Sequence, residues 1–390
     1  MYSWSMWRIF QSRIAMKNLV QIAVFITLLT ACSSSRMLDY QDVSLVNYNV
    51  PLHTDSVFTS RYRFVKFQNK GNESVIIGIE RLLCAEERIF VMDRKGNHLL
   101  AFDQDGTFLK STKSMIGRGK NEYISIFDAT IDPTERRIYA YCDAPCKLMV
   151  FDYDLNVIEN IDFKTFTWEL SVDDKYLYIL SPDLKNGSVI RLMRFDKKNL
   201  KGAATEIVST HSAIHELGTQ GKSLVHSGDC FFAMPFEQMI YRIKDGEIVN
   251  SYKVGFRDSW FEKDGNNTGL SDFMRINRDK HWMITNICTS NSSLLFNTNK
   301  YHAFVLNLRT NVCASYKGIV DDHYIPISSR LIPTDGLYGQ AVYEINPESI
   351  KKYLEKVADD DKRHYDSDLV KLALEYSRDN NPTICIWSIK

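Results

Sequence analysis

Short runs of alternating apolar and polar residues dominate the middle of the chain, from about residue 62 to residue 346. These runs are rich in Val, Ile, Tyr and Phe, and they are separated by Asp-Gly, Asn-Gly, Asp-Asp and Lys-Asn pairs. A period of two residues, interrupted by turn-forming pairs, is typical of antiparallel β-strands. We therefore expect an all-β fold over most of the chain.

A unit of three strands and two turns recurs along this region. Its clearest copy is residues 88–111, RIFVMDRKGNHLLAFDQDGTFLKS, and the next is residues 137–161, RIYAYCDAPCKLMVFDYDLNVIENI. Looser copies follow, and six residues mark the copies: Phe102, Phe151, Phe195, Tyr241, Val305 and Tyr343. Successive markers lie roughly 40 to 65 residues apart, a spacing that suits the four-stranded blade of a β-propeller. Six copies predict a six-bladed β-propeller. The alternative, a pair of β-sandwiches, does not require one unit to recur six times.

The C-terminal region predicts two short helices and a final strand. Asn346 precedes Pro347, a residue favoured in the first helical turn, and apolar residues then follow at helical spacing. We expect two short helices within about residues 347–377. Residues 383–389, TICIWSI, are apolar enough to form a buried strand. We expect this strand to pair with residues 62–67 and close the ring, because closure removes free sheet edges.

The N-terminus has the pattern of an export signal. Residues 19–31, LVQIAVFITLLTA, form an apolar run that is too short to span a bilayer, which takes about 20 apolar residues. Basic residues precede this run and Cys32 follows it, which is the order of a secretory signal peptide. Leu29-Thr30-Ala31-Cys32 also resembles the lipobox of bacterial lipoproteins, and this implies cleavage before Cys32 and lipidation of its thiol. An ordinary signal peptide with an incidental cysteine is the alternative.

These features divide the chain into three parts. We assign residues 1–31 to a lipoprotein signal peptide, residues 32–59 to a lipid-anchored tether and residues 60–390 to the propeller. Translation from Met16 rather than Met1 would give a more compact signal, and both starts stay open.

The charge balance argues against one class of partner. The chain has 48 basic and 48 acidic residues, and removal of residues 1–31 takes away three basic residues and no acidic one. The remaining 45 basic and 48 acidic residues give a net charge of −3 and no polybasic surface for nucleic acid or anionic lipid. Attachment to a lipid bilayer would therefore depend on acylated Cys32.

Part of the chain resembles a known family. Residues 77–141 resemble the six-bladed β-propeller lipoproteins of Bacteroides and its relatives, whose blades are NHL-like. The most specific motif is residues 117–123, GRGKNEY, where that family usually has GRGPGEY. Lys120-Asn121 in place of Pro-Gly leaves the geometry of the turn open. The resemblance implies a propeller anchored by lipid in the cell envelope, which we expect at the outer membrane facing the periplasm. It implies no settled activity.

The same motif supplies candidate ligand-binding residues. Residues 116–126 would link the outermost strand of one blade to the innermost strand of the next, on the face where propellers usually bind ligands. We expect Arg118 and Glu122 to point toward the central channel and Tyr123 to offer a stacking face. The alternative is structural: the glycines permit a tight passage and Arg118 pairs with Glu122 to hold it.

The cysteines predict little chemistry beyond Cys32. Seven others remain, an odd number, and most lie in apolar runs that suit buried thiols. Cys142 and Cys146 bracket a turn, so a disulfide between them in an oxidising compartment is open. No second pair of cysteines or histidines with ligand spacing accompanies them, so we predict no metal site there. His211 and His215 could share a helical face, but a surface loop is the favoured interpretation of that segment.

Two classes of function fit the sequence. We find no Gly-x-Ser-x-Gly elbow, phosphate-binding loop or paired-carboxylate motif, which favours a non-catalytic binding or scaffold lipoprotein for a glycan, peptide or protein partner. The alternative is a periplasmic lyase or hydrolase with its active site at the channel mouth, because such sites assemble from several blades. We expect no cofactor for the binding protein, and the enzyme alternative leaves open a divalent cation in the channel.

Overall fold

The computed structural model describes residues 39–390 except 144, 184–188, 213–220, 262–268, 322–324, 346, 356–364 and 376–380. The predicted signal peptide and Cys32 lie outside the described residues. The chain divides into two compact units, residues 1–39 and 40–390, and the second unit is the one described by itself below.

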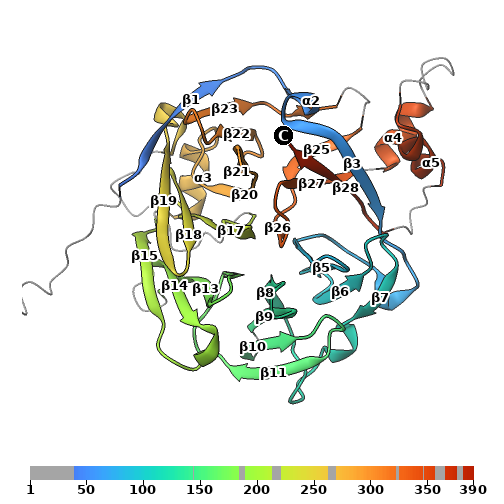
Figure 1. The fold of residues 1–390 in the computed structure, drawn as a ribbon, viewed down its shortest axis with the longest axis vertical. Helices are drawn as coiled ribbons and strands as arrows, with labels where there is room; N and C mark the ends of the chain where they lie inside the picture. Colours follow the sequence, from blue (N-terminus) through green and yellow to red (C-terminus); the bar gives the residue numbers. More distant parts are fainter. Residues whose placement is uncertain are drawn as a thin grey trace, which may run out of the picture. The chain divides into compact units, whose positions relative to one another are not determined.

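Six groups of four adjacent strands surround a common centre (Figure 1). We call these groups blades 1 to 6. β1 (Gln41–Asn47) joins two of these groups into a nine-stranded sheet, and β26 (Thr334–Asp335) adds a fifth strand to another. Blade 1 comprises β4 (Arg81–Cys84), β5 (Ile89–Asp93), β6 (His98–Phe102) and β7 (Phe108–Ser111). Blade 2 comprises β8 (Ile126–Asp132), β9 (Arg137–Asp143), β10 (Cys146–Phe151) and β11 (Val157–Asp162). Blade 3 comprises β12 (Glu169–Val172), β13 (Tyr176–Pro182), β14 (Val189–Asp196) and β15 (Thr205–His211).

The remaining three blades follow the same order around the ring. Blade 4 comprises β16 (Leu224–Ser227), β17 (Asp229–Ala233), β18 (Met239–Lys244) and β19 (Glu247–Val254). Blade 5 comprises β20 (Ile284–Thr289), β21 (Ser293–Thr298), β22 (Ala303–Asn307) and β23 (Val312–Tyr316). Blade 6 comprises β25 (Ile327–Leu331), β27 (Gln340–Ile345), β28 (Thr383–Ile389) and β3 (Phe58–Lys66). The predicted all-β propeller fold is confirmed.

Short elements connect or flank the blades. The strands are β1 (Gln41–Asn47), β2 (Leu52–His53), β24 (Ile319–Val320) and β26 (Thr334–Asp335). The α-helices are α2 (Thr54–Val57), α3 (Leu270–Ile276), α4 (Pro347–Leu354) and α5 (Ser367–Leu374). Single 3-10 turns lie at Asn72–Ser74, Lys113–Met115, Lys197–Asn199 and Arg257–Ser259.

The hydrophobic core consists of six clusters, one between each pair of neighbouring blades. The geometry of a strand explains this division, because successive side chains point to opposite faces of the sheet. In β5, Ile89 and Val91 pack toward blade 6, whereas Phe90 and Met92 pack toward blade 2. Both faces of the inner strands are therefore buried, and the stability of each blade depends on its two neighbours.

The ring closes as the apolar C-terminal strand predicts. β28 pairs antiparallel with β3, with Trp387 opposite Tyr62, and with β27 on its other side. The buried Trp387 ring lies 5.7 Å from that of Phe58 and 5.4 Å from that of Tyr62, centroid to centroid. Blade 6 therefore joins one strand from near the N-terminus to three from the C-terminal region.

The two predicted C-terminal helices form between β27 and β28. α4 and α5 fall within the expected segment 347–377 and pack against each other at the rim of blade 6 (Figure 1). Asp366 caps α5, because its carboxylate accepts hydrogen bonds from the backbone N–H groups of Asp368 (2.9 Å) and Leu369 (3.0 Å). The buried Leu369 then packs into the cluster between blades 5 and 6.

The propeller begins earlier than the predicted boundary at residue 60. β1 pairs in parallel with the outer strand β19 of blade 4 and then with the outer strand β23 of blade 5. Val43 of β1 is buried in the cluster between these two blades. Much of the predicted tether, residues 32–59, is thus part of the fold, because its alternating apolar positions can cover the edges of two sheets.

The segment between β25 and β27 enters the centre of the ring. Its short strand β26 pairs in parallel with β4, with Thr334 opposite Leu82 and Asp335 opposite Leu83. The N–H of Gly336 also donates to the carbonyl of His226 (2.9 Å), so β26 lies between the inner strands of blades 1 and 4. A Cβ at Gly336 would lie 2.0 Å from the carbonyl oxygen of Cys84, which explains the glycine there.

Candidate functional site

Five charged side chains meet at the centre of the ring, and we call them the central charge cluster: Arg81, Asp128, Glu169, Lys222 and Asp335. They come from β4, β8, β12, the residues just before β16, and β26. The four other than Lys222 are 0% exposed and Lys222 is 2% exposed.

Ion pairs and hydrogen bonds join the members of this cluster, although Nε of Arg81 is buried without a hydrogen-bond partner among the described residues. Nη1 of Arg81 lies 3.1 Å from Oδ2 of Asp128 and 3.6 Å from Oδ2 of Asp335, and Nζ of Lys222 lies 3.0 Å from Oδ1 of Asp128. Glu169 accepts hydrogen bonds from the backbone N–H of Ser223 (2.7 Å). Desolvation raises the pKa of Glu169 and Asp335, although nearby cations oppose this shift. The cluster joins the inner strands of several blades, and solvent does not reach its acids.

The predicted ligand-binding link, residues 116–126, has a different geometry from the one expected. The carboxylate of Glu122 accepts a hydrogen bond from the N–H of Gly119 (2.6 Å), and it lies so close to Gly117 that a Cβ there would be 2.1 Å from Oε2. Arg118 is exposed, and no ion pair of the described residues joins it to Glu122. The glycines therefore admit the carboxylate of the loop itself, and ligand binding by Arg118 and Glu122 stays a prediction.

Tyr123 does not offer the stacking face that the motif predicted. Its ring is fully buried, and its hydroxyl lies 2.6 Å from Oγ1 of Thr112. Burial raises the pKa of this hydroxyl well above its usual value. Tyr123 belongs to the hydrophobic cluster between blades 1 and 2, so its role is to fix the link against the core.

Cys142 and Cys146 do not form the disulfide that their spacing left open. Both are free thiols, with Cys142 buried and Cys146 exposed. The register of β9 and β10 places Cys142 opposite Lys147, the residue after Cys146. Consecutive side chains of a strand point to opposite faces, so the two sulfurs lie on different sides of the hairpin.

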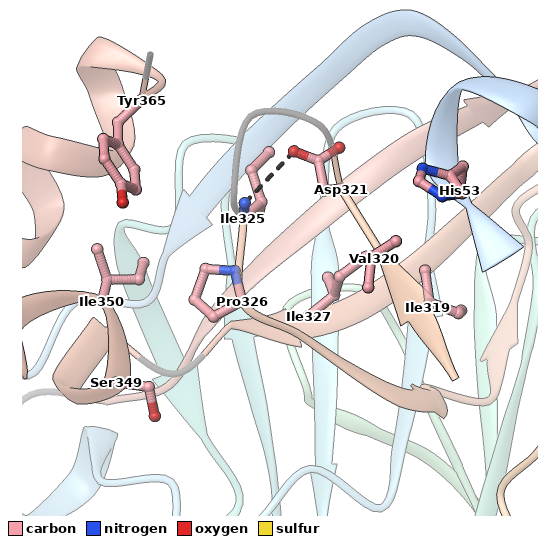
Figure 2. A pocket seen from close by; sticks show the side chains of 10 residues that line it. All are labelled: His53, Ile319, Val320, Asp321, Ile325, Pro326, Ile327, Ser349, Ile350 and Tyr365. Atoms are coloured by element: carbon pink, nitrogen blue, oxygen red, sulfur yellow. Dashed lines mark hydrogen bonds between the residues drawn. The ribbon is translucent and has the colours of Figure 1, made fainter. Parts of the chain in front are cut away.

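A cavity of 560 Å³ opens between the link from blade 5 to blade 6 and the two C-terminal helices. Its wall is mainly aliphatic and contains Ile319, Val320, Ile325, Pro326, Ile327 and Ile350. Four polar side chains complete it: His53, Asp321, Ser349 and Tyr365. Figure 2 shows Tyr365, Ile350 and Ser349 on one side and His53, Val320 and Ile319 on the other. We call this cavity the helix pocket.

The walls of the helix pocket are held by local contacts. β24 pairs in parallel with β2, which places His53 opposite Val320. The carboxylate of Asp321 accepts hydrogen bonds from the Thr54 hydroxyl (2.5 Å) and from the N–H of Ile325 (3.3 Å), the second of which is drawn in Figure 2. The volume lies within the range of roughly 300–1,000 Å³ typical of small-molecule sites. An apolar wall with a few polar groups can bury an aliphatic or aromatic group and orient it.

Sequence reasoning missed the helix pocket but selected its face. The pocket lies at a link between an outermost and an innermost strand, as residues 116–126 do, but four blades further along the chain. Its lining comes from segments near residues 53, 320 and 350, whose proximity no local motif encodes. The central charge cluster had a local signal, because Arg81 and Glu169 are charged residues at the starts of short strands that contain no other charged residue.

Two further properties concern only the described residues. No group of three His, Cys, Asp or Glu side chains there could hold a metal ion, and His215 lies outside them. None of the described helices is long and apolar enough to cross a membrane.

Fold and pocket define a β-propeller whose link face has a predominantly apolar cavity. The chain belongs to the family described as a domain of unknown function, DUF4934, whose family model matches residues 47–388. No curated protein matches the chain.

A solved structure supports the fold. A "putative exported protein" of Bacteroides fragilis is 15% identical, with a TM-score of 0.65 over 90% of this chain and 100% of that one. The propeller domain of Cps50 (Swd1) from Myceliophteria thermophila is 10% identical, with a TM-score of 0.37 over 63% of this chain and 68% of that one. The second likeness is too distant to support any inference, and the first concerns the fold alone.

Proposed function

We propose that this chain is a lipid-anchored envelope protein whose propeller binds a peptide or protein partner without catalysis, by accepting an apolar side chain of the partner in the helix pocket. One observation carries the proposal: a 560 Å³ cavity with a mainly aliphatic wall on the link face. Burial of an apolar side chain in such a wall contributes roughly 1.5–3 kcal/mol.

The wall of the helix pocket favours a peptide over a glycan. A sugar ring presents hydroxyl groups around its whole edge, and each one buried against Ile or Val without a partner costs free energy. An aliphatic or aromatic side chain has no such cost. Val320 is the most accessible apolar part of the wall, at 38% exposed.

The alternative enzyme would use polar residues that line the central channel. Asp128, Glu169 and Asp335 are the acids of the central charge cluster, and all three are buried in contacts with Arg81, Lys222 or the backbone. A substrate would have to displace these contacts before it reached a carboxylate. This cost favours the binding function.

Envelope anchoring rests on the sequence. Cys32 follows a lipobox-like segment, and the Bacteroides fragilis relative is described as exported, which agrees with this location. In a bacterial host that processes lipoproteins, we expect labelled palmitate to enter the full-length chain and the protein to sediment with membranes. Cys32→Ala is expected to abolish the label and release the protein. An unchanged label in Cys32→Ala would contradict the anchor without affecting the pocket.

Peptide binding can be tested by selection from a displayed library of random short peptides. We expect the selected peptides to share a large aliphatic or aromatic residue, and fluorescence anisotropy then gives their Kd. Val320→Glu places a charge in the wall and is expected to raise Kd at least about tenfold, the equivalent of about 1.4 kcal/mol.

Val249→Glu is the matched control. Val249 lies on the outer strand β19 of blade 4, is 47% exposed and does not line the pocket. The Kd of Val249→Glu for the selected peptides should equal that of the wild type. Selection of no peptide, or equal Kd values for Val320→Glu and wild type, would refute peptide binding at this pocket.

A further inference from the structure

A second concave site lies between blades 4 and 5. It has a volume of 280 Å³ and is lined by the hairpin between β16 and β17, the hairpin between β20 and β21, and the loop that follows β26. These hairpins join the first and second strands of their blades, so they lie at the opposite ends of the inner strands from the links that form the helix pocket. We call this site the hairpin groove.

An exposed aromatic ring forms one wall of the hairpin groove. Tyr338 is 48% exposed, and its hydroxyl donates a hydrogen bond to Oδ1 of Asn291 (2.5 Å). One side of the ring rests on Gly228, where a Cβ would lie 2.6 Å from Cδ2 of Tyr338. Gly339, with φ +69°, ends the loop. The ring is therefore held in place while much of it stays accessible.

Hydrogen-bond donors and acceptors line the same groove. Arg242 of β18 pairs with Asp229 of β17, with Nε 2.6 Å from Oδ2. Both side chains keep some exposure, so free N–H donors of the guanidinium and the second carboxylate oxygen remain available to a ligand. Ser290 and Asn291 add a hydroxyl and an amide.

We propose that the hairpin groove binds one pyranose ring of a saccharide. A sugar ring has a C–H face that packs on an exposed aromatic ring, and hydroxyl groups that each donate and accept hydrogen bonds. Paired donors and acceptors, as in Arg242 and Asp229, match neighbouring hydroxyls of this kind. The volume lies just below the range of roughly 300–1,000 Å³ typical of drug-sized ligands, which suits a single ring.

The composition of the groove favours a neutral saccharide over other ligands. Asp229 neutralises Arg242, so the groove has no unbalanced charge to attract an anion. Its accessible ring is flanked by polar groups, unlike the aliphatic wall of the helix pocket. This binding is separate from the proposed peptide binding, since the two cavities share no residue and open at opposite ends of the inner strands.

Saturation-transfer difference NMR with methyl β-glucoside, methyl β-galactoside and methyl α-mannoside tests the proposal. We expect at least one glycoside to receive saturation at its ring protons from the wild-type protein. Tyr338→Ala removes the stacking surface and should weaken binding at least tenfold. Tyr338→Phe keeps the ring and should retain most of the signal, which separates stacking from the bond to Asn291.

Tyr48→Ala is the matched control. Tyr48 is 47% exposed, close to the exposure of Tyr338, and does not line the groove. The saturation-transfer signal of Tyr48→Ala should equal that of the wild type. Circular dichroism checks that each variant is folded. Absence of transfer to all three glycosides, or an unchanged signal in Tyr338→Ala, would overturn the proposal. Displacement of the glycoside by a peptide that binds the helix pocket would also overturn it, since it would show one shared site.

Discussion

Arg81 connects four parts of the ring through one side chain. Its guanidinium faces Asp128 of blade 2 and Asp335 of β26, and it donates to the carbonyls of Leu170 in blade 3 (2.7 Å) and Leu224 in blade 4. A planar group with five donors suits this arrangement, since an ammonium has only three. The sequence shows a charge at the start of an apolar strand, but only the folded ring shows its partners.

Loss of this side chain should be strongly destabilising. Arg81→Met removes the cation and leaves Asp128 and Asp335 buried with less compensation, a change that costs about 3–5 kcal/mol of unfolding free energy. The control is Arg275→Met in α3, where the ion pair with Asp272 is 73% and 56% exposed, and a loss below about 1 kcal/mol is expected. Urea denaturation measures both. Equal losses of unfolding free energy in the two variants would mean that Arg81 stabilises the fold no more than an exposed ion pair does.

His281 should make stability depend on pH below neutrality. Burial, with His302 and Lys300 nearby, lowers the pKa of His281 from 6.5 to about 4. Between these values the unfolded chain binds a proton that the folded protein does not. The contribution of His281 is therefore complete above pH 6.5 and is lost progressively as pH falls toward 4. Between pH 7 and pH 5 this loss is about 2 kcal/mol.

His281→Gln isolates the effect, because glutamine can still hydrogen-bond to Thr298, whose Oγ1 lies 2.8 Å from Nδ1 of His281, but does not titrate. We expect the free energy of unfolding of the wild type to fall by about 2 kcal/mol more than that of the variant between pH 7 and pH 5. Urea denaturation at pH 7 and pH 5 gives the change in unfolding free energy for the wild type and for the variant. Identical pH dependence in the two proteins would contradict a depressed pKa.

At the scale of elements, the recurring unit of strands and turns predicted the strands well. Phe102, Phe151, Phe195, Tyr241 and Val305 all lie in the third strands of their blades. Tyr343 lies in the second strand of blade 6, because α4 and α5 separate that strand from the third. The last copy of the repeat was therefore recognisable but incomplete in the sequence.

Local patterns did not determine register. The spacing of Cys142 and Cys146 is compatible with a hairpin, but a disulfide also needs both sulfurs on the same face. The pairing of Cys142 with Lys147 places them on opposite faces. The prediction of a stacking face at Tyr123 is wrong for a related reason. Its motif predicts a link between blades but not which side chain of that link is buried in the core. Both properties depend on contacts with neighbouring strands.

At the scale of the whole molecule, the candidate sites arise from closure of the ring. The helix pocket needs β2 from the N-terminal region, the link between blades 5 and 6, and helices inserted before the last strand. The hairpin groove needs two blades and the loop after β26. Sequence patterns predicted the ring and its closing strand, whereas the cavities depend on how distant segments meet.

β1 should contribute to the stability of the propeller. Residues 41–47 cover the outer edges of blades 4 and 5, and the burial of Val43 between them is worth roughly 1.5–3 kcal/mol. A chain that begins at residue 40 keeps β1 and is the reference for the melting temperature of the propeller. Deletion of residues 1–50 should lower the melting temperature by roughly 2–4 °C relative to this reference and promote aggregation, because two sheet edges become exposed. Differential scanning calorimetry and light scattering measure these effects. Equal melting temperatures for the two chains would show that β1 belongs to the tether after all.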